Sequence, residues 1–401
     1  MRRTLTSLAV TLAAASGLVA GTVQTAASAA PTGRAHAEKV CVTAQPGYAG
    51  CLAQKWVAPT GAAVDPFSPV PDAVRPLAVS GKTPSDIQSA YKLSGLSAGG
   101  RTVAIVDAYG YTNAERDLGI YRAQFGLPAC TKANGCLKVV NQSGGTTAPR
   151  FNAGWADEQA LDLDAVSAAC PSCNILLVQS SSASFADLGA GVNTAAKGSG
   201  VAAISNSYGG GDAADSTYGT YYNHPGIAVT ASTGDNGYAG ASYPASSHYA
   251  TAVGGTSLTA SATTRGWTET VWSGSGSGCS TLNAAPAGQT TAMTGCSGRS
   301  MADVAADADP ATGLAVYAPT SKTASSWAQY GGTSLSSPIV ASVYALSGNT
   351  AGYANTLPYA NPSGLFDVTS GSNGSCATFC TARAGYDGPT GLGTPNGTIA
   401  F

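Results

Sequence analysis

The residue types best suited to chemistry gather in one short stretch, WADEQALDLDAV at positions 155–166. It holds four acids and no Lys or Arg, although the whole chain of 401 residues has only 21 Asp and Glu. If the stretch is a helix, Glu158 and Asp162 are four residues apart and share a face, so their carboxyl groups can meet. Two adjoining carboxyls cannot both ionise cheaply, so one has a raised pKa and is ready to exchange a proton. Asp157 and Asp164 point away from this face, and we expect them to face solvent.

The alternative for this stretch is an acidic helix face that points into water. Val166 and Ala169, however, continue the stripe that begins with Glu158 and Asp162, so the acid pair points where an apolar helix face would pack. No base lies within the stretch to hold the charges in a salt bridge. The pattern therefore favours a pair of carboxyls that exchange a proton.

A second chemically informative segment is GGTSLSSPIVASVYAL at residues 331–346. The glycines place Ser334 on a tight turn, and the apolar spacing after it predicts a helix. Pro338 is expected within the first turn of that helix, where its missing N–H is tolerated. The Ser334 hydroxyl then lies near unpaired backbone N–H groups, which can also hold an oxyanion. The alternative is an ordinary N-capping serine.

The elements that must position these residues alternate along the chain. We expect buried parallel strands at 101–107, 136–140, 174–179, 201–206, 227–232 and 250–255, and helices at 113–125, 155–166 and 184–197. Such alternation predicts an α/β domain, doubly wound, with a mostly parallel central sheet and helices on both faces. Another helix is expected after Thr83, which can cap it, with Pro84 in the first helical position.

Five motifs, each present once, include or flank these residues along the chain. They are EQALD (158–162), ASTGDNG (231–237), RSMADVAADADPATG (299–313), GGTSLSSP (331–338) and AGYDGPTGLGTP (384–395). Together they resemble the sedolisins, the serine-carboxyl peptidases, which are relatives of subtilisin with acids in place of histidine. The resemblance covers about residues 83–401. It implies a subtilisin-like fold and an endopeptidase, and a carboxyl base with a protonated carboxyl donor predicts an acidic pH optimum.

The resemblance also implies a role for each matching side chain. Ser334 matches the nucleophile, Glu158 the general base that accepts its proton, and Asp162 the acid that holds the glutamate in place. Asp235 matches the oxyanion residue, which must be protonated to donate a hydrogen bond. A plain turn at its GDNG sequence is compatible with that role. Asp107 matches a supporting acid, and a capping or turn residue after a strand is its alternative.

The C-terminal motif implies one structural Ca2+ ion. In the family, two aspartates and several main-chain carbonyls hold calcium, and Asp367 and Asp387 match the aspartates. Val368, Arg383 and Gly385 match the carbonyl positions, with Arg383 standing where glycine is usual. Two turn aspartates without a metal are the alternative.

Two other functions stay open at this point. One is a histidine-dependent, subtilisin-like hydrolase. Neither His224 nor His248 has the HGT context of a subtilisin histidine, and His36 lies outside the domain. The other is a non-catalytic secreted binding protein built on a peptidase fold, although all the matching catalytic positions are intact. The sequence GLSAG at 95–99 precedes a strand, which is the wrong context for a lipase-type elbow.

The N-terminal residues predict export. Residues 1–29 have the charged, apolar and small-residue order of a secretory signal peptide. Residues 30–82 are rich in Pro and Ala and are interpreted as a short pro-segment or linker, followed by the peptidase domain at 83–401. We expect no large pro-domain, because about 50 residues are too few for a sizeable core. The expected protein is a secreted monomer that acts on peptides or proteins.

Charge and cysteine usage agree with these expectations. The net charge is −2, so we expect no nucleic acid as partner, and no later run is apolar and long enough to predict a membrane span. An even count of cysteines, clustered locally, favours five small-loop disulfides over a redox CxxC or a zinc site. The near neighbours are Cys41 and Cys51, Cys130 and Cys136, Cys170 and Cys173, Cys279 and Cys296, and Cys376 and Cys380.

Overall fold

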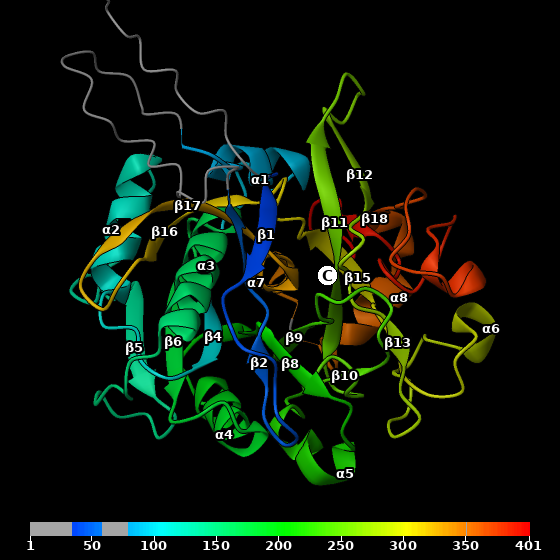
Figure 1. Ribbon diagram of the computed structural model, residues 1–401, viewed down its shortest axis with the longest axis horizontal. Coiled ribbons are helices and arrows are strands. Elements are labelled where there is room, and N and C mark those ends of the chain that lie inside the picture. Colours follow the sequence, from blue (N-terminus) through cyan, green and yellow to red (C-terminus); the bar gives the residue numbers. More distant parts are fainter. Residues whose placement is uncertain (1–33, 58–78, 350) are drawn as a thin grey trace, which may run out of the picture.

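A mostly parallel β-sheet forms the centre of the molecule (Figure 1). The computed structural model describes residues 34–57, 79–349 and 351–401. Within them, an eight-stranded sheet has the order β12-β11-β9-β7-β4-β6-β5, with β15 also paired to β11. All these neighbours are parallel except β11 and β12. The strands are β4 (Thr102–Ala108), β5 (Leu137–Asn141), β6 (Asn174–Ser180), β7 (Val201–Asn206), β9 (Ala228–Ser232), β11 (Thr251–Ala260), β12 (Trp267–Val271) and β15 (Val304–Asp307). The predicted signal peptide lies outside the described residues.

Helices cover both faces of this sheet, as a parallel sheet requires. Alternate residues of β4 point to opposite faces. Val103 and Ile105 belong to a core with α3 and α7, whereas Ala104 and Val106 pack with α4. The helices are α1 (Pro84–Ala90), α2 (Ala114–Gln124), α3 (Ala153–Ala169), α4 (Phe185–Ala196) and α7 (Thr333–Ser347), of which α1 and α2 pack against α3. The predicted doubly wound α/β fold is confirmed.

Capping residues define where the helices begin. The Thr83 side chain accepts a hydrogen bond from the Asp86 N–H, and the Asp86 carboxylate accepts one from the Thr83 N–H. With Pro84 in the first position, this reciprocal capping starts α1 at the predicted residue. Asn152 and Ser184 cap α3 and α4 with their side chains alone, each accepting from a backbone N–H three residues ahead.

Residues 34–57 contribute strands to two smaller sheets. One has the order β1-β3-β17-β16, with β1 (His36–Lys39), β3 (Gln54–Val57), β17 (Ser325–Gly331) and β16 (Leu314–Pro319). The other has the order β10-β8-β2, with β10 (Ser242–Tyr243), β8 (Tyr208–Gly211) and β2 (Gly50–Cys51). The described part of the expected pro-segment or linker therefore packs on the expected peptidase domain, where Figure 1 shows it in dark blue.

The remaining α-helices and β-strands are short. They are α5 (Asp215–Tyr218), α6 (Thr291–Thr294), α8 (Leu357–Ala360), β13 (Gly278–Cys279), β14 (Ser300–Met301), β18 (Leu365–Phe366) and β19 (Thr394–Pro395). Among the described residues, none of the helices has the length and apolar character needed to cross a membrane.

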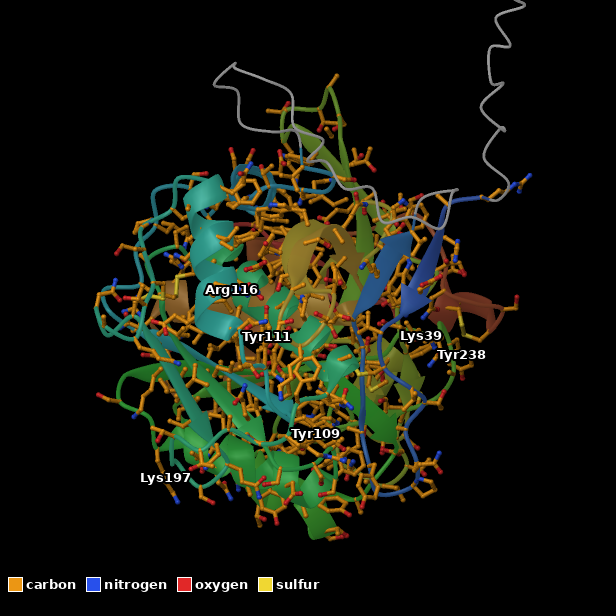
Figure 2. The ribbon with its side chains drawn as sticks, turned by 60° about the vertical axis from the view of Figure 1, so that its left-hand side comes forward. Lys39, Tyr109, Tyr111, Arg116, Lys197 and Tyr238 are labelled. Carbon is orange, nitrogen blue, oxygen red and sulfur yellow. A yellow bond between two sulfur atoms is a disulfide. The ribbon has the colours of Figure 1, made fainter. Side chains whose placement is uncertain are left out.

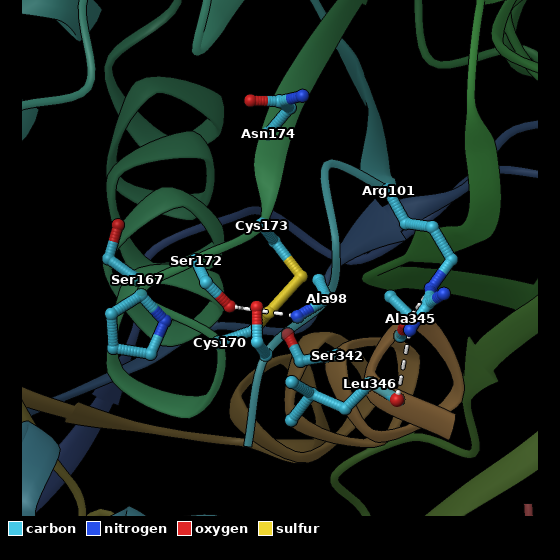
Figure 3. Close-up of a disulfide and its surroundings, with 12 residues drawn as sticks. Ala98, Arg101, Ser167, Cys170, Ser172, Cys173, Asn174, Ser342, Ala345 and Leu346 are labelled. Atoms are coloured by element: carbon cyan, nitrogen blue, oxygen red, sulfur yellow. Dashed lines mark hydrogen bonds between the residues drawn. A yellow bond between two sulfur atoms is a disulfide. The ribbon is translucent and has the colours of Figure 1, made fainter. Parts of the chain in front are cut away.

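The ten cysteines form the five near-neighbour disulfides that the sequence favours. The bridge between Cys170 and Cys173 closes the turn after α3 (Figure 3), so CPSC is a structural pair and no thiol is left for redox chemistry. The Ser172 hydroxyl in this turn accepts from the Ala98 N–H at 3.0 Å. Nearby, Arg101 donates to carbonyls in the last turn of α7, which Figure 3 also shows. This corner ties α3, β4 and α7 together.

Candidate active site

Ser334 is held at the start of α7 by a special backbone conformation. Gly332 occupies the N-cap position with φ of 95°, in the left-handed region that favours glycine. Ser334 is therefore the second residue of the helix and not its N-cap, which removes the alternative raised by the sequence. Its side chain is fully buried, and its hydroxyl donates to the Ser207 carbonyl at 3.3 Å.

Pro338 lies farther along α7 than the sequence predicts. It is the sixth residue of the helix, beyond the first turn, so the prediction of a first-turn proline was wrong. Proline offers no N–H to the carbonyl four residues earlier, which belongs to Ser334. The Ser207 hydroxyl lies 3.4 Å from that carbonyl oxygen, although its single proton makes the shorter hydrogen bond, to Asp162 Oδ1 at 2.8 Å. Ser207 thus contacts both the side chain and the main chain of Ser334.

Three buried carboxyl groups lie close to Ser334. Glu158 and Asp162 come from α3, and Asp107 comes from β4. Glu158 Oε2 accepts from the Ala53 N–H at 2.7 Å, and Asp162 Oδ1 accepts from the Ser207 hydroxyl at 2.8 Å. Their other oxygens, and both oxygens of Asp107, accept no hydrogen bond from any described residue. A buried carboxyl without donors favours the protonated acid, because the ionised form loses its solvation.

Burial and mutual repulsion raise the pKa values of this cluster. Burial is the largest cause of the raised pKa of Glu158, followed by the charge of Asp107, while the Ser334 hydroxyl and the Ala53 N–H lower it. Burial also raises the pKa of Asp162 most, and the charges of Asp107 and Glu158 add to this. Burial raises the pKa of Asp107 as well. The cluster therefore keeps its protons at pH values above the range in which carboxyl groups usually titrate, and it can exchange them.

The two other acids of α3 are not solvent-facing, so this expectation was wrong. Asp164 is buried, and its Oδ2 accepts from the Tyr317 N–H at 3.0 Å. Asp157 is half-buried, and its Oδ1 accepts from the Tyr330 hydroxyl at 2.9 Å. The physical reason is that β16 and β17 cover the side of α3 that the sequence pattern leaves to water.

Asp235 approaches the start of α7 from the loop after β9. Its Oδ1 accepts from both the N–H and the hydroxyl of Thr333, each at 2.8 Å. Its Oδ2 accepts from the Gln54 side-chain amide at 3.0 Å. Burial raises the pKa of Asp235 to about 6, although the hydrogen bonds from Thr333 and Gln54 lower it. This carboxyl is therefore protonated in mild acid and can then donate one hydrogen bond.

The histidines make their hydrogen bonds away from this cluster. The His224 ring bonds to the Tyr221 carbonyl at 3.0 Å, and the His248 ring lies 3.3 Å from the Ala284 carbonyl. His36 is exposed beside Glu38. Among the described residues, no histidine therefore contacts Ser334, and the group that could act as its base is a carboxyl.

The residues expected to hold calcium lie on two neighbouring loops. Asp367 Oδ2 accepts from the Gly385 N–H at 2.9 Å, and Asp387 Oδ2 accepts from the Arg383 N–H at 3.3 Å. Burial first, and the nearby charge of Asp367 in addition, raise the pKa of Asp387 to about 6. In the described part of the chain, no group of three or more His, Cys, Asp or Glu side chains is arranged for a metal. Val368, the residue after Asp367, has a buried side chain.

Comparisons with known proteins place the chain among serine-carboxyl peptidases. It is 31% identical over 355 residues to kumamolisin from Bacillus sp. (strain MN-32), covering 79% of this chain and 62% of that protein. It is 33% identical over 172 residues to sedolisin from Pseudomonas sp. (strain 101), covering 38% and 28%. The solved structure of Pseudomonas sedolisin matches with a TM-score of 0.66 and 25% identity, covering 80% of this chain and 96% of that one.

The chain belongs to the sedolisin family. It spans about three fifths of the length of kumamolisin and less than a third of sedolisin in the sequence matches. No family model matches it.

Sequence reasoning missed the residues that support the sedolisin site from outside its motifs. Ser207 follows directly after the buried strand β7, and a polar residue at the carboxyl end of a parallel strand is a signal that was available. Ala53 and Gln54 carried no such signal. Their contacts with Glu158 and Asp235 join residues more than 100 positions apart.

The charge of Asp107 sets the proton affinity of its neighbour in this sedolisin site. We expect Asp107→Asn to lower the pKa of Glu158, because it removes the largest charge effect that raises it. The pKa is measured from the 13C shifts of Glu158 across pH in protein carrying Ser334→Ala. Asp157→Asn, on the same helix turn but not among the causes of that shift, should leave the pKa unchanged. An equal shift in both variants would contradict the assignment.

Proposed function

We propose that this chain is a secreted endopeptidase that cuts peptide bonds with Ser334, Glu158 and Asp162, and that it works best in acid. The observation that carries the proposal is the buried cluster of carboxyls beside Ser334, in a place where the described histidines make no contact. The relatives named above support the same chemistry, since the solved Pseudomonas sedolisin is a serine-carboxyl proteinase.

The proposed reaction follows the logic of a catalytic triad. Ser334 Oγ attacks the substrate carbonyl carbon while Glu158 takes its proton. The Ser334 hydroxyl gives up only a long, 3.3 Å hydrogen bond to the Ser207 carbonyl when it turns towards the glutamate. Asp162, fixed by the Ser207 hydroxyl, keeps the neighbouring acid in place. Glu158 then passes the proton to the leaving nitrogen, and water releases the acyl group by the reverse sequence.

The developing oxyanion is stabilised from two directions. The N–H of Ser334 is one of the unpaired donors in the first turn of α7. Asp235 is the other donor, and it donates only while protonated. Since its pKa is raised to about 6, the donor is present in acid and is lost as the pH rises through that value. This sign predicts an acidic range for the peptidase.

Replacement of the proposed base gives the sharpest test of the function. Glu158→Gln keeps the size of the side chain but cannot accept a proton, so we expect kcat/KM to fall by about 10²- to 10⁴-fold. Changing His224 or His248 to Gln should leave the activity at the wild-type level. The measurement is release of peptides from a peptide library in acid, with Ser334→Ala as the blank. Activity that survives in Glu158→Gln and disappears in a histidine variant would favour the histidine-dependent hydrolase. No release by the wild type from acid to neutral pH would favour a binding protein.

The protonation state of Asp235 provides a second test. Asparagine donates at every pH, so Asp235→Asn should remove the fall in kcat/KM that we expect near pH 6 in the wild type. The full pH profile of both proteins is compared. Asp212→Asn, whose carboxylate accepts from Ser246 instead, is the matched control and should keep the wild-type profile. A wild-type profile without any loss near that pH would count against Asp235 as the donor.

We also propose that Asp367 and Asp387 hold a structural Ca2+ ion with carbonyls of the loop at 383–385 and of Val368. The residues fit a cation, because the charge of Asp367 adds to the raised pKa of Asp387 and the Arg383 guanidinium makes its hydrogen bonds elsewhere. It donates to the carbonyls of Tyr386 and Met293. A bound divalent cation would neutralise the pair and brace these loops.

Calcium binding predicts a stability effect that one substitution removes. Adding Ca2+ at about a hundred times its Kd should raise the Tm by about 5 °C. Asp387→Asn should abolish this rise, whereas Asp309→Asn, in a turn elsewhere, should keep it. Calorimetry on protein carrying Ser334→Ala, with and without a chelator, measures the change. An equal rise in all variants would locate the ion at another site.

The disulfides and the signal sequence support export. We infer that it acts as a monomer on peptides or proteins outside the cell, without a nucleic acid or a membrane as partner.

A further inference from the structure

Ser207 is a buried serine that contacts two members of the proposed triad. It joins the end of β7 to the start of β8, and its side chain has no exposed surface. Its main-chain carbonyl accepts from the Ser334 hydroxyl at 3.3 Å. Its own hydroxyl faces two acceptors, a carboxyl oxygen of Asp162 and the main-chain carbonyl oxygen of Ser334. One side chain therefore touches both the proposed acid and the backbone that carries the proposed nucleophile.

A hydroxyl has a single proton, so Ser207 can donate fully to only one of its two acceptors. Its oxygen is 2.8 Å from Asp162 Oδ1, an ordinary length for such a bond, but 3.4 Å from the Ser334 carbonyl oxygen. In this arrangement the proton points to Asp162. The hydroxyl oxygen also has lone pairs, with which it can accept a hydrogen bond from another group.

The Ser334 carbonyl needs a donor from outside its helix because of Pro338. In a regular helix this carbonyl accepts from the N–H four residues later, but residue 338 is a proline and has no N–H. Buried main-chain carbonyls normally have a donor, and an unpaired one is costly. The helix therefore leaves an acceptor open at the residue that carries the nucleophile, next to a hydroxyl that is engaged elsewhere.

Protonation of Asp162 permits a second arrangement of the same atoms. A proton on Asp162 Oδ1 can be donated to the Ser207 oxygen across the same 2.8 Å. The Ser207 proton is then free to turn to the Ser334 carbonyl oxygen, and that distance must shorten by about 0.6 Å to reach an ordinary length. The result is a continuous chain of hydrogen bonds from Asp162 through Ser207 to Ser334.

We propose that Ser207 is a positioning residue that works as a hydroxyl switch. Its proton points to Asp162 while that acid is ionised, and to the Ser334 carbonyl while Asp162 carries a proton. No covalent bond of Ser207 breaks in this change, because only its O–H turns. The contribution of the switch to catalysis rests on the proposed peptidase function, whereas the switch itself follows from the contacts of the site.

The switch helps to decide which of two neighbouring carboxyls keeps a proton. Only the arrangement with a protonated Asp162 gives the Ser334 carbonyl its donor, so the open acceptor favours a proton on Asp162. Like charges in contact cannot both ionise cheaply, and a neutral Asp162 therefore allows Glu158 to ionise. The ionised glutamate is the form that can take the Ser334 proton. Ser207 and Pro338 together thus favour the assignment of Glu158 as the base.

The ionisable groups around Asp162 act on it in addition to the switch. Burial raises the pKa of Asp162 most, and the charges of Asp107 on β4 and Glu158 on α3 raise it further. The Ser207 hydroxyl lowers this pKa as a donor to the ionised acid. Its bond to the open carbonyl in the second arrangement has the opposite sign. The Tyr208 hydroxyl of β8 donates to a side-chain oxygen on β7 instead.

The cations of α2, which packs against α3, are engaged elsewhere. Arg122 donates to a serine hydroxyl and to two main-chain carbonyls. Arg116 and Tyr111 both donate to Asp117, and Figure 2 shows Arg116 and Tyr111 side by side next to the cyan helix α2. Helix α7 contains no charged residue. No cation among these groups competes with Ser207 for Asp162.

The test measures the pKa of Asp162 in a double-mutant cycle. Pro338→Ala supplies an N–H to the Ser334 carbonyl, which then no longer needs Ser207 as its donor. We expect the pKa of Asp162 to fall in Pro338→Ala, because the protonated form loses its additional hydrogen bond. In the Ser207→Ala background the same substitution should leave the pKa unchanged. The pKa is followed from the 13C shift of the Asp162 carboxyl carbon across pH. The full chain carries Ser334→Ala, which removes the hydroxyl and keeps the carbonyl.

Further variants separate the switch from a purely structural role. Ser207→Thr keeps a hydroxyl and should retain the effect of Pro338→Ala on Asp162. Ser205→Ala is the matched control, because it removes another buried hydroxyl of β7, one that lies 3.0 Å from Ser337 Oγ. It should leave the effect of the proline substitution at its original size. In the active enzyme, Ser207→Ala should lower kcat about tenfold with KM nearly unchanged, and Ser205→Ala should keep both constants.

The outcomes distinguish the switch from the function of the enzyme. A pKa of Asp162 that does not respond to Pro338→Ala would overturn the switch. An equal response with and without the Ser207 hydroxyl would overturn it as well. Neither result depends on peptide cleavage, so the proposed function stands if the wild type cuts peptides. Coupling between the two substitutions in a protein that cuts no peptide would support the switch and reject the peptidase function.

Discussion

Three carboxyl groups are buried together without a Lys or Arg partner among the described residues, and the packing of the whole site follows from this. An ionised carboxylate taken out of water costs several kcal/mol unless donors or a counter-charge replace its solvation. Among the described residues, Glu158 and Asp162 have one donor each, and Asp107 has none. The group is therefore stable mainly by holding protons, and the same property makes it suitable for proton transfer. It also explains why α3 must be packed on nearly every side, by α7, β4 and β16.

The topology brings these groups together at one edge of the sheet. Asp107 lies near the carboxyl end of β4, Ser207 follows β7, and Asp235 follows β9, and these three strands are neighbours in the sheet. The start of α7 with Ser334 packs above them, against β7 and β9. Parallel strands present their carboxyl ends on the same side, so residues distant in the sequence meet without a long loop. Ser207 joins the parts, since its hydroxyl holds Asp162 and its carbonyl holds the Ser334 hydroxyl.

Periodic and local patterns in the sequence were informative, whereas long-range contacts were not. The strands of the parallel sheet, the main helices and the cap at Thr83 follow from apolar spacing and from short-range chemistry, whereas the order of the strands in the sheet was not predicted. The spacing of Glu158 and Asp162 was enough to place them on one face. The burial of Asp164 depends on a contact with β16, which lies 153 residues later in the chain. No local pattern contains that information. The contacts of residues 48–54 were invisible for the same reason.

Occupation of the cleft and protonation of the site are physically coupled. Burial is the largest cause of the raised pKa of both Asp235 and Glu158, and the extended peptide at Leu52 and Ala53 is part of what excludes water from them. A peptide in the cleft therefore favours the protonated form of Asp235, which is the form able to donate a hydrogen bond to an oxyanion. The hydrogen bond from the Ala53 N–H acts in the opposite sense on Glu158: it lowers the pKa of that carboxyl and so favours the ionised form that serves as the base. An empty, hydrated cleft has neither advantage. The contacts of Ala53 with Glu158 and of Gln54 with Asp235 show how a polypeptide segment beside the start of α7 sets the protonation of both carboxyls.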